Sequence, residues 1–321
     1  MRVGLIGTGV MGVTHARAWQ QRPEFLTSVY TPSDKARAFA QQNNLNACHT
    51  LEELLRQVDI VDICTPTGQH PGLTRQAAQA GKHVICEKPI ALTLTEADEM
   101  IQDCQQAGVR LFIAHVLRFF PQYHAAWQQV QAGAVGHPKV LRLTRISAPP
   151  AGREWMLDET QSGGVAVDLM LHDLDFARWI AGEVTRVYAV NSRKAGKVVA
   201  QANLTHASGA ISLIEAAWAA PTGVFRTSID LAGTTGVIEW SSDTRPPLQW
   251  HGSNPIPDVL EGPIRPAAAG DPYALQLWHA YDAIQSGQPF LIEPADARAD
   301  LALALAVNRS VQSGQPVEVS A

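Results

Sequence analysis

Two residues in the segment SGGVAVDLMLHDLD (162–175) have the chemistry and the spacing to move a proton. Asp168 and His172 are four residues apart, so an α-helix would place both side chains on one face. The unperturbed pKa of histidine lies near neutrality, and a neighbouring carboxylate can orient the imidazole, so His172 could accept the proton of an alcohol that loses a hydride. The two preceding glycines favour a site, because they permit close backbone approach. The alternative is that Asp168, Asp173 and Asp175 are acids favoured by the helix dipole and that His172 is a packed residue.

The segment HVICEKPIA (83–91) ends a buried strand with two opposite charges. Pro89 stops the strand directly after Glu87 and Lys88. A lysine at such a strand end can hydrogen-bond a substrate hydroxyl, and Glu87 would hold it or pair with it. The alternative is a surface salt bridge that contributes little energy. The sequence leaves open whether the Lys88–Pro89 peptide bond is cis.

A glycine-rich turn near the first residue predicts a dinucleotide site. The motif Gly7-Thr8-Gly9-Val10-Met11-Gly12 follows an apolar strand at 3–6 and precedes a helix at 11–19. The first glycine permits the tight turn, the second lets a pyrophosphate approach the backbone, and the third allows close helix packing. The positive end of the helix dipole attracts the phosphate charge. A tight turn without a phosphate is the alternative.

The end of the second predicted strand bears on which dinucleotide binds. The motif expects an acid there that holds the adenosine ribose, but Tyr30 and Thr31 occupy the place, and Asp34 comes late enough to open the next helix. The polar and basic side chains that could contact a 2′-phosphate are Ser33, Lys35 and Arg37. The sequence therefore favours NADP over NAD. The alternative is that the two cations are solvated helix residues.

A third turn, CTPTGQH (64–70), follows another buried strand. In a doubly wound sheet the ligand lies beyond the carboxyl ends of the strands, so Thr65, Pro66 and Thr67 should border the dinucleotide. We also expect His70 at this border, unless it only begins the next helix. Glu87, Lys88 and Pro89 end another strand on the same edge of the sheet, so we expect them to contact the cofactor where its nicotinamide would lie.

These turns require a scaffold that gathers strand ends. Up to residue 120, predicted strands (3–6, 25–30, 59–64, 84–86, 110–116) alternate with predicted helices (11–19, 33–42, 50–55, 69–80, 95–107), which indicates a parallel doubly wound sheet. Thr50 and Glu53 predict a capping box. After residue 120 several alternating strands between 139 and 240 indicate a mostly antiparallel sheet. Residues 241–272 should be loop, and helices at 273–285 and 295–313 close the chain. We expect two domains, 1–120 and 121–321, of the α/β class.

Composition narrows the class of protein further. The 321 residues carry a net charge of −5 with no basic run, which argues against a nucleic-acid binder. No apolar stretch reaches about 18 residues, and the first residues form no secretory signal, so we expect neither a membrane span nor export. The four cysteines form no C-x-x-C pair and are expected to be reduced, in a cytoplasmic protein with no metal site.

Side chains near the predicted domain junction are candidates for substrate contact. His115 and Arg118 follow the strand at 110–116, and Trp155 precedes the paired glycines. An arginine there could hold a carboxylate or phosphate, and a tryptophan could stack on a sugar ring. The alternative is that they belong to the domain-junction core.

The motifs in this order resemble the Gfo/Idh/MocA oxidoreductases. The resemblance rests on the glycine motif, Thr65-Pro66 with His70, Glu87-Lys88-Pro89, and Gly163-Gly164 with Asp168-x-x-x-His172-Asp173, and it covers essentially the whole chain. It implies a Rossmann domain, then an α/β domain whose large open sheet assembles dimers or tetramers, and it implies NAD or NADP. By position it implies a catalytic trio, in which His172 is the general acid/base, Lys88 bonds the reacting hydroxyl and Asp168 binds or orients.

The resemblance also bounds the activity. It implies hydride transfer on a sugar, a polyol, an inositol or a related hydroxyl or carbonyl compound. Two alternatives stay open: redox-assisted glycoside cleavage with a tightly bound NAD, and a nucleotide-sensing regulator without turnover.

Overall fold

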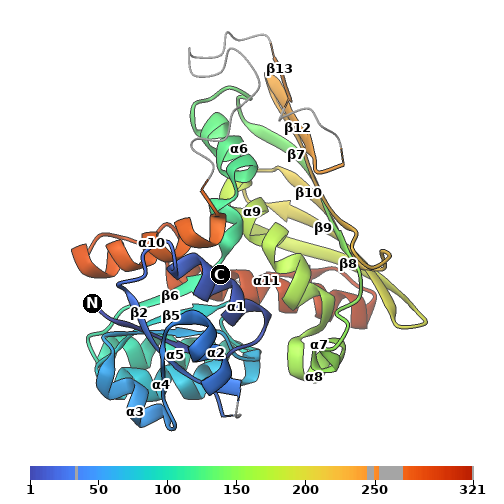
Figure 1. Cartoon of the computed structure of the whole chain (residues 1–321). Helices are drawn as coiled ribbons and strands as arrows, with labels where there is room; N and C mark the ends of the chain where they lie inside the picture. Colours follow the sequence, from blue (N-terminus) through green and yellow to red (C-terminus); the bar gives the residue numbers. More distant parts are fainter. Residues whose placement is uncertain (33–34, 244–248, 253–269, 320–321) are drawn as a thin grey trace. The chain divides into compact units, whose positions relative to one another are not determined.

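The computed structural model describes residues 1–32, 35–243, 249–252 and 270–319 (Figure 1). The chain divides into two compact units, one formed by residues 1–119 and 270–298 and the other by residues 120–269 and 299–321. Residues 270–298 thus group with the first unit, because helix α10 (Pro272–Ser286) packs against helix α1 (Val10–Trp19). The predicted domains 1–120 and 121–321 stay a prediction.

The first unit is built on a parallel sheet of six strands in the order β3-β2-β1-β4-β5-β6. This confirms the predicted doubly wound α/β fold. The strands are β1 (Val3–Ile6), β2 (Leu26–Tyr30), β3 (Asn46–Ala47), β4 (Ile60–Ile63), β5 (His83–Glu87) and β6 (Leu111–Ala114). The helices and short turns are α1 (Val10–Trp19), α2 (Lys35–Asn43), α3 (Leu51–Gln57), η1 (Thr67–Gln69), α4 (His70–Gln79), α5 (Leu94–Gln106), η2 (Val116–Phe119) and α10 (Pro272–Ser286).

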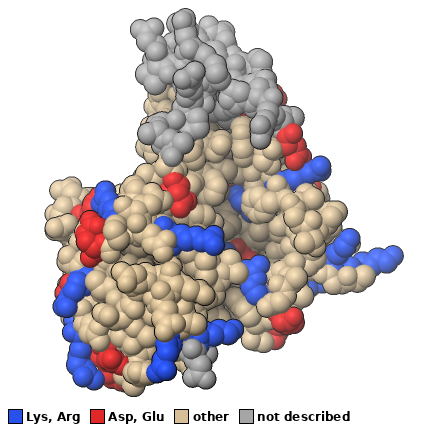
Figure 2. All heavy atoms as spheres, viewed as in Figure 1, with Lys and Arg blue, Asp and Glu red and all other residues tan. Residues whose placement is uncertain are grey.

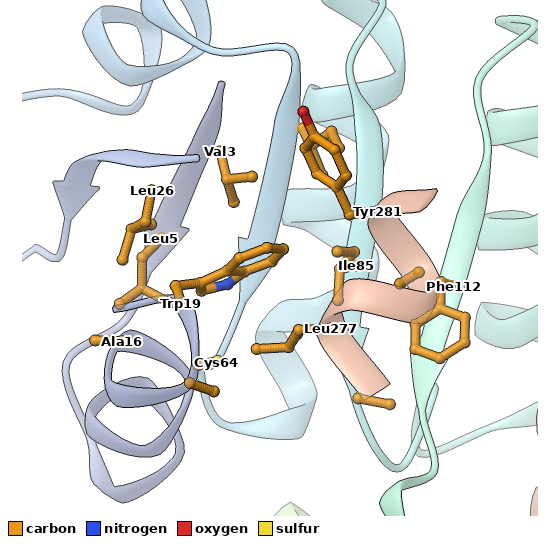
Figure 3. Close-up of a cluster of buried hydrophobic side chains, with 14 of the residues drawn as sticks. Val3, Leu5, Ala16, Trp19, Leu26, Cys64, Ile85, Phe112, Leu277 and Tyr281 are labelled. Carbon is orange, nitrogen blue, oxygen red and sulfur yellow. The ribbon is translucent and has the colours of Figure 1, made fainter. Parts of the chain in front are cut away.

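An aromatic core joins α1 and α10 to one face of this sheet. Trp19 lies fully buried among side chains of the strands and of α10 (Figure 3). Tyr281 of α10 stacks on Phe25 with ring centroids 4.1 Å apart and meets Trp19 edge-on. Burying side chains of this size stabilises the fold by roughly 1.5–3 kcal/mol each. This packing holds α1 at a fixed height on the sheet, and with it the glycine-rich turn.

The predicted capping box at Thr50 is only half formed. The Thr50 hydroxyl accepts the N–H of Glu53 at 3.1 Å, but the Glu53 carboxylate accepts the N–H of His49 instead of returning to Thr50. The complete reciprocal box lies at the start of α5, between Thr93 and Glu96. Both arrangements satisfy helix N–H groups that would otherwise lack acceptors.

The second unit contains a sheet of eight strands in the order β13-β12-β11-β7-β10-β9-β8-β14. Among the described strand pairs of this second sheet, only β7 and β10 run parallel, which confirms the predicted mostly antiparallel sheet. The strands are β7 (Pro138–Ser147), β8 (Val184–Lys194), β9 (Lys197–His206), β10 (Ile211–Trp218), β11 (Phe225–Gly233), β12 (Gly236–Ser241), β13 (Gln249–Gly252) and β14 (Val317–Glu318). The helical segments are α6 (Pro121–Gln131), α7 (Glu154–Leu157), α8 (Glu159–Ser162), η3 (Ala166–Met170), α9 (Leu171–Ala181) and α11 (Pro294–Ser313), whose first residues belong to the first unit.

Strand β13 corrects the prediction that 241–272 is loop. Val237 of β12 pairs with His251 of β13, so the sheet continues into this segment. The many prolines and glycines in the sequence 241–272 argue against a strand, but β13 needs only four pairing residues and lies between them in the sequence. The rest of the predicted loop, at 244–248 and 253–269, lies outside the described residues.

Two surface properties complete the description. No helix in the described part of the chain is long and apolar enough to cross a membrane. Figure 2 shows lysines and arginines interspersed with aspartates and glutamates among the described residues of the face in view.

Candidate active site

Four turns of the first unit lie at the carboxyl ends of adjacent parallel strands. The turns follow β2, β1, β4 and β5, which are neighbours in the sheet. The strand order reverses direction between β1 and β4, and such a switch point is where doubly wound sheets bind their ligands. The fold therefore brings together the predicted cofactor residues near Gly9, Tyr30, Thr65 and Lys88.

The glycine-rich turn leaves room for a ligand at one glycine only. Gly7 has a φ of +100°, and a Cβ there would lie 2.6 Å from the Cys64 carbonyl oxygen. A Cβ on Gly12 would collide with the Gly7 carbonyl oxygen. A Cβ on Gly9 would have nothing within 4 Å. The first and third glycines are thus required by packing, whereas the second borders open space, as close approach of a pyrophosphate requires.

Helix α1 begins directly after Gly9, and within the described chain no side chain caps it. Its first N–H groups therefore suit an anion. Val10 is 59% exposed, Thr8 and Met11 are half-buried, and all three flank this helix end. The residues present fit the pyrophosphate of a dinucleotide.

The end of β2 lies beside the glycine turn. The Gly7 N–H donates to the Tyr30 carbonyl oxygen at 2.9 Å, and the Tyr30 and Thr31 side chains are half-buried. Lys35 and Arg37 are exposed on α2. Ser33, which was predicted to contact the cofactor, lies outside the described residues.

The turn after β4 contains a hydroxyl that has no partner. Thr65 Oγ1 is buried and has no hydrogen-bond partner among the described residues, Pro66 is exposed, and Thr67 is buried. A buried donor of this kind suits a ligand that accepts its hydrogen bond. His70 instead joins two turns: Nε2 lies 3.0 Å from the Thr65 carbonyl oxygen and Nδ1 lies 2.9 Å from that of Pro89. Burial lowers the pKa of His70.

The turn after β5 directs its acid inward. Glu87 is buried, and its Oε2 accepts the backbone N–H of Lys88 at 3.1 Å. Lys88 is half-buried, Pro89 is buried, and the peptide bond between them is cis. Glu87 therefore holds the backbone of Lys88.

A buried polar cluster under these turns was missed in the sequence. His15 of α1 lies 2.9 Å from Asp62 of β4 and 2.9 Å from Glu87 of β5, and Trp19 donates to Asp62 at 2.8 Å. The available signal was Asp62, an acid inside the apolar run IVDI, but the prediction took 59–64 as a nearly continuous apolar strand. No local sequence pattern indicates that His15, which lies 47 residues earlier, is the partner of Asp62.

In the second unit Asp168 and His172 lie on consecutive helical segments. Asp168 belongs to η3, a π-helical segment, and His172 to the first turn of α9; both side chains are half-buried. A spacing of four residues puts two side chains on one face of an α-helix, but this rule does not hold through a π-helical turn. That Asp168 and His172 share one face therefore stays a prediction. Such turns are frequent at functional sites. The preceding Gly163 has a φ of +74°, and its carbonyl oxygen accepts from Asn308 at 2.9 Å.

The residue after His172 anchors α9 to the sheet. Asp173 is buried and accepts two hydrogen bonds from Arg145 of β7, at 2.7 and 3.1 Å. Arg145 also donates to the Tyr123 hydroxyl at 3.2 Å. Asp173 therefore lies in the first turn of α9, as the alternative expects of an acid favoured by the helix dipole, and it is also the partner of a buried ion pair.

The predicted substrate residues differ in burial. His115 is buried after β6. Arg118 is buried in η2 and donates to the Leu291 carbonyl oxygen at 2.9 Å, close to Asp296. Trp155 is half-buried on α7. Their contact with a substrate stays a prediction.

Comparison with known proteins agrees with this architecture. Residues 1–115 match the Gfo/Idh/MocA model described as an oxidoreductase family with an NAD-binding Rossmann fold, and residues 123–239 match the Gfo/Idh/MocA C-terminal domain. The chain therefore belongs to the Gfo/Idh/MocA family of oxidoreductases, with an NAD-binding Rossmann fold at residues 1–115.

Named relatives cover nearly the whole chain. A D-apiose dehydrogenase of Paraburkholderia graminis is 31% identical over 98% of this chain and 88% of its own length. A myo-inositol 2-dehydrogenase of Thermotoga maritima is 30% identical over 99% of this chain and 98% of its own. Among solved structures, a probable dehydrogenase from Thermotoga maritima is 27% identical with a TM-score of 0.84 and covers 99% of each chain. A levoglucosan dehydrogenase with NADH and levoglucosan has a TM-score of 0.88 over 100% of both chains at 24% identity, which shows the shared fold.

Proposed function

We propose that this oxidoreductase transfers a hydride between a nicotinamide dinucleotide and a hydroxyl or carbonyl carbon of a sugar, polyol, inositol or related compound. The observation that carries the proposal is the open space over Gly9 at the uncapped start of α1, on the same edge of the sheet as the end of β5 that carries Lys88. Relatives named for D-apiose, myo-inositol and 1,5-anhydro-D-fructose support this range of substrates.

In the proposed mechanism the bound dinucleotide supplies the hydride acceptor or donor. Lys88 hydrogen-bonds the reacting hydroxyl and favours its loss of a proton, which His172 accepts as general base. Asp168 binds the substrate or orients the imidazole. The alcohol thereby loses a hydride and a proton and becomes a carbonyl compound; in reduction His172 returns the proton.

The proposal includes the substrate contacts expected of His115, Arg118 and Trp155. Trp155 is the least buried of the three, which suits stacking on a sugar ring. A guanidinium N–H of Arg118 donates to the Leu291 carbonyl oxygen, and the proposal assigns the same guanidinium a contact with an anionic or polar group of the substrate.

A coenzyme-reduction screen tests the activity. Purified protein is incubated with sugars, inositols and other polyols together with NADP⁺ or NAD⁺, and nicotinamide absorbance is followed. The proposal expects reduced coenzyme with at least one polyol. Glycoside cleavage without net reduction, by protein that retains coenzyme through purification, would overturn it in favour of redox-assisted hydrolysis, and coenzyme binding without any turnover would favour a nucleotide sensor.

We propose further that the coenzyme is NADP(H) in preference to NAD(H). Neither Tyr30 nor Thr31 supplies a carboxylate that would repel a 2′-phosphate, and Lys35 and Arg37 are exposed on the adjoining helix. Titration of the protein with NADPH and with NADH, followed by nicotinamide fluorescence, compares the two affinities. Tighter NADPH binding that is lost in the Lys35→Ala/Arg37→Ala variant supports the preference, and tighter NADH binding contradicts it.

We also propose that the protein works in the cytoplasm. All four cysteines are buried and free, which is typical of the reducing cytoplasm.

Large apolar side chains are exposed on the eight-stranded sheet, namely Tyr188, Val190, Ile211, Leu213 and Phe225. A second copy of the chain would cover them, so we propose a homodimer or homotetramer formed through this sheet.

A further inference from the structure

A histidine with a carboxylate on each ring nitrogen lies buried under the glycine-rich turn. The His15 side chain has no exposed surface; its Nδ1 lies 2.9 and 3.0 Å from the two Asp62 oxygens, and its Nε2 lies 2.9 Å from Glu87 Oε1. The three side chains come from α1, β4 and β5, so the cluster ties the helix of the glycine turn to two strand ends.

The two carboxylates that face its ring nitrogens favour a cationic histidine. A neutral imidazole has one N–H, so one of its nitrogens would present a lone pair to a carboxylate. Trp19 Nε1 and the Lys88 N–H also donate to these carboxylates. Burial alone would lower the pKa of His15, but the Asp62 carboxylate beside it raises that pKa well above its usual value.

The cluster is hydrogen-bonded internally. The donor atoms of His15, Asp62 and Cys64 lie within 4.8 Å of one another, a spacing that metal ligands can have. Both Asp62 oxygens, however, already accept hydrogen bonds from His15, and one also accepts from Trp19. The buried Cys64 thiol also belongs to the cluster, since its Sγ lies 3.2 Å from His15 Nδ1 and 3.6 Å from Asp62 Oδ1. The geometry is that of an ion-pair network.

This network ends at Lys88, the residue that we propose hydrogen-bonds the reacting hydroxyl of the substrate. One Glu87 oxygen faces His15, and the other accepts the backbone N–H of Lys88 at 3.1 Å. On the other side of Lys88, the Pro89 carbonyl oxygen lies 2.9 Å from His70. Without His15, the Glu87 carboxylate would be buried without its cation and would leave this position, because an unpaired buried charge is strongly unfavourable.

We propose that His15 is a positioning residue for Lys88 and acts through the Glu87 carboxylate. The inference rests on the proposed function, because it takes Lys88 to contact the substrate. It adds that the position of Lys88 depends on a side chain of the glycine-turn helix that lies wholly in the protein interior.

A conservative and a disruptive variant of Glu87 separate positioning from stability. The amide of Glu87→Gln can accept the Lys88 N–H and donate to a neutral His15, whereas Glu87→Leu can do neither. We expect Glu87→Leu and His15→Leu each to lower kcat roughly 10- to 100-fold, and Glu87→Gln to stay within about threefold of wild type. NADPH affinity, followed by fluorescence, should change less than about threefold in all of them.

The control is Leu54→Ala, which removes a fully buried side chain from α3 and destabilises the same unit without touching the cluster. It should keep wild-type kcat below its melting temperature. If Glu87→Leu keeps wild-type kcat, or if Gln and Leu at position 87 lose the same activity, the proposal is wrong. Because His15→Leu buries two unpaired carboxylates and can fail to fold, the Glu87 pair decides by itself.

A measurement that needs no substrate distinguishes failure of the His15 positioning network from failure of the proposed function. In protein labelled with ¹⁵N-histidine, NMR should show both His15 ring nitrogens protonated from about pH 5 to 8, and Nε2 deprotonated in Glu87→Gln. A wild-type His15 with a single protonated nitrogen would contradict the positioning network. If the spectra agree but wild type turns over no polyol, the proposed function fails while the network stands.

Discussion

Gly9 and Gly12 serve different purposes in the glycine-rich turn, and substituting each of them by alanine should distinguish these purposes. Gly9 has an extended backbone conformation and open space where a Cβ would lie, whereas a Cβ on Gly12 meets the Gly7 carbonyl oxygen. We expect Gly9→Ala to change the free energy of unfolding by less than about 0.5 kcal/mol and to weaken NADPH binding about tenfold or more.

Gly12→Ala is the matched comparison. It should destabilise the protein by about 1–3 kcal/mol, because the helix must move away from the turn. Urea unfolding measures stability, and nicotinamide fluorescence measures binding. Unchanged coenzyme affinity in Gly9→Ala would mean that the open space over this glycine is not the pyrophosphate site.

The charge of His15 should appear as a pH dependence of stability. Its pKa is raised in the folded protein, so its contribution is complete below the unfolded pKa of about 6.5 and is lost as pH rises through the folded pKa. The stability difference between wild type and His15→Leu should therefore narrow above about pH 6.5, by up to about 1.4 kcal/mol per pH unit. Denaturant unfolding at several pH values, with Leu54→Ala as the control, measures this; a difference that is constant or widens with pH contradicts a cationic His15.

At the scale of the element, helix α9 depends on the ion pair beneath it. Arg145→Ala leaves the buried Asp173 carboxylate without its cation and should cost about 3–5 kcal/mol of stability. Arg142→Ala, on the same strand, removes only an exposed pair with Asp230 and should cost about 0–1 kcal/mol. Thermal and urea unfolding compare the two, and equal losses would mean that the buried pair does not anchor α9.

The elements were predictable where the pattern was local. Apolar runs such as VGLI and the strand at 84–86 are continuous because the parallel sheet is covered, and they predicted β1 and β5 closely. The glycine motif and the Glu87-Lys88-Pro89 turn could be placed at one sheet edge, because all parallel strands end there.

What escaped prediction depends on contacts between distant segments. The approach of His15, Asp62 and Glu87 follows from the order of strands β1, β4 and β5, which hydrophobic periodicity does not contain. The return of α10 to the first unit depends on aromatic packing between Trp19 and Tyr281. The π-helical turn at Asp168 is equally invisible, since a helical pattern predicts only regular spacing.

At the scale of the whole molecule, the exposed sheet face should govern assembly. Val190 is 46% exposed on β8 and Leu213 is 37% exposed on β10. Leu213→Lys or Val190→Lys would bury a charge in an interface between copies, so either should shift the protein to a smaller species in analytical ultracentrifugation. Lys139→Glu, an exposed change on β7 that adds no buried charge at these positions, is the control. A wild-type monomer, or variants of unchanged mass, would contradict assembly through this face.

Hydride transfer that depends on Lys88 and His172 is tested most directly by the formation of reduced coenzyme in wild type, Lys88→Ala and His172→Ala. His137→Ala removes an exposed imidazole from the same unit as His172 and is the control. With a polyol that wild type oxidises, we predict at least about 100-fold lower turnover for both active-site variants, coenzyme affinity within about threefold, and an unchanged control. Normal turnover in either Lys88→Ala or His172→Ala would contradict the role assigned to that residue.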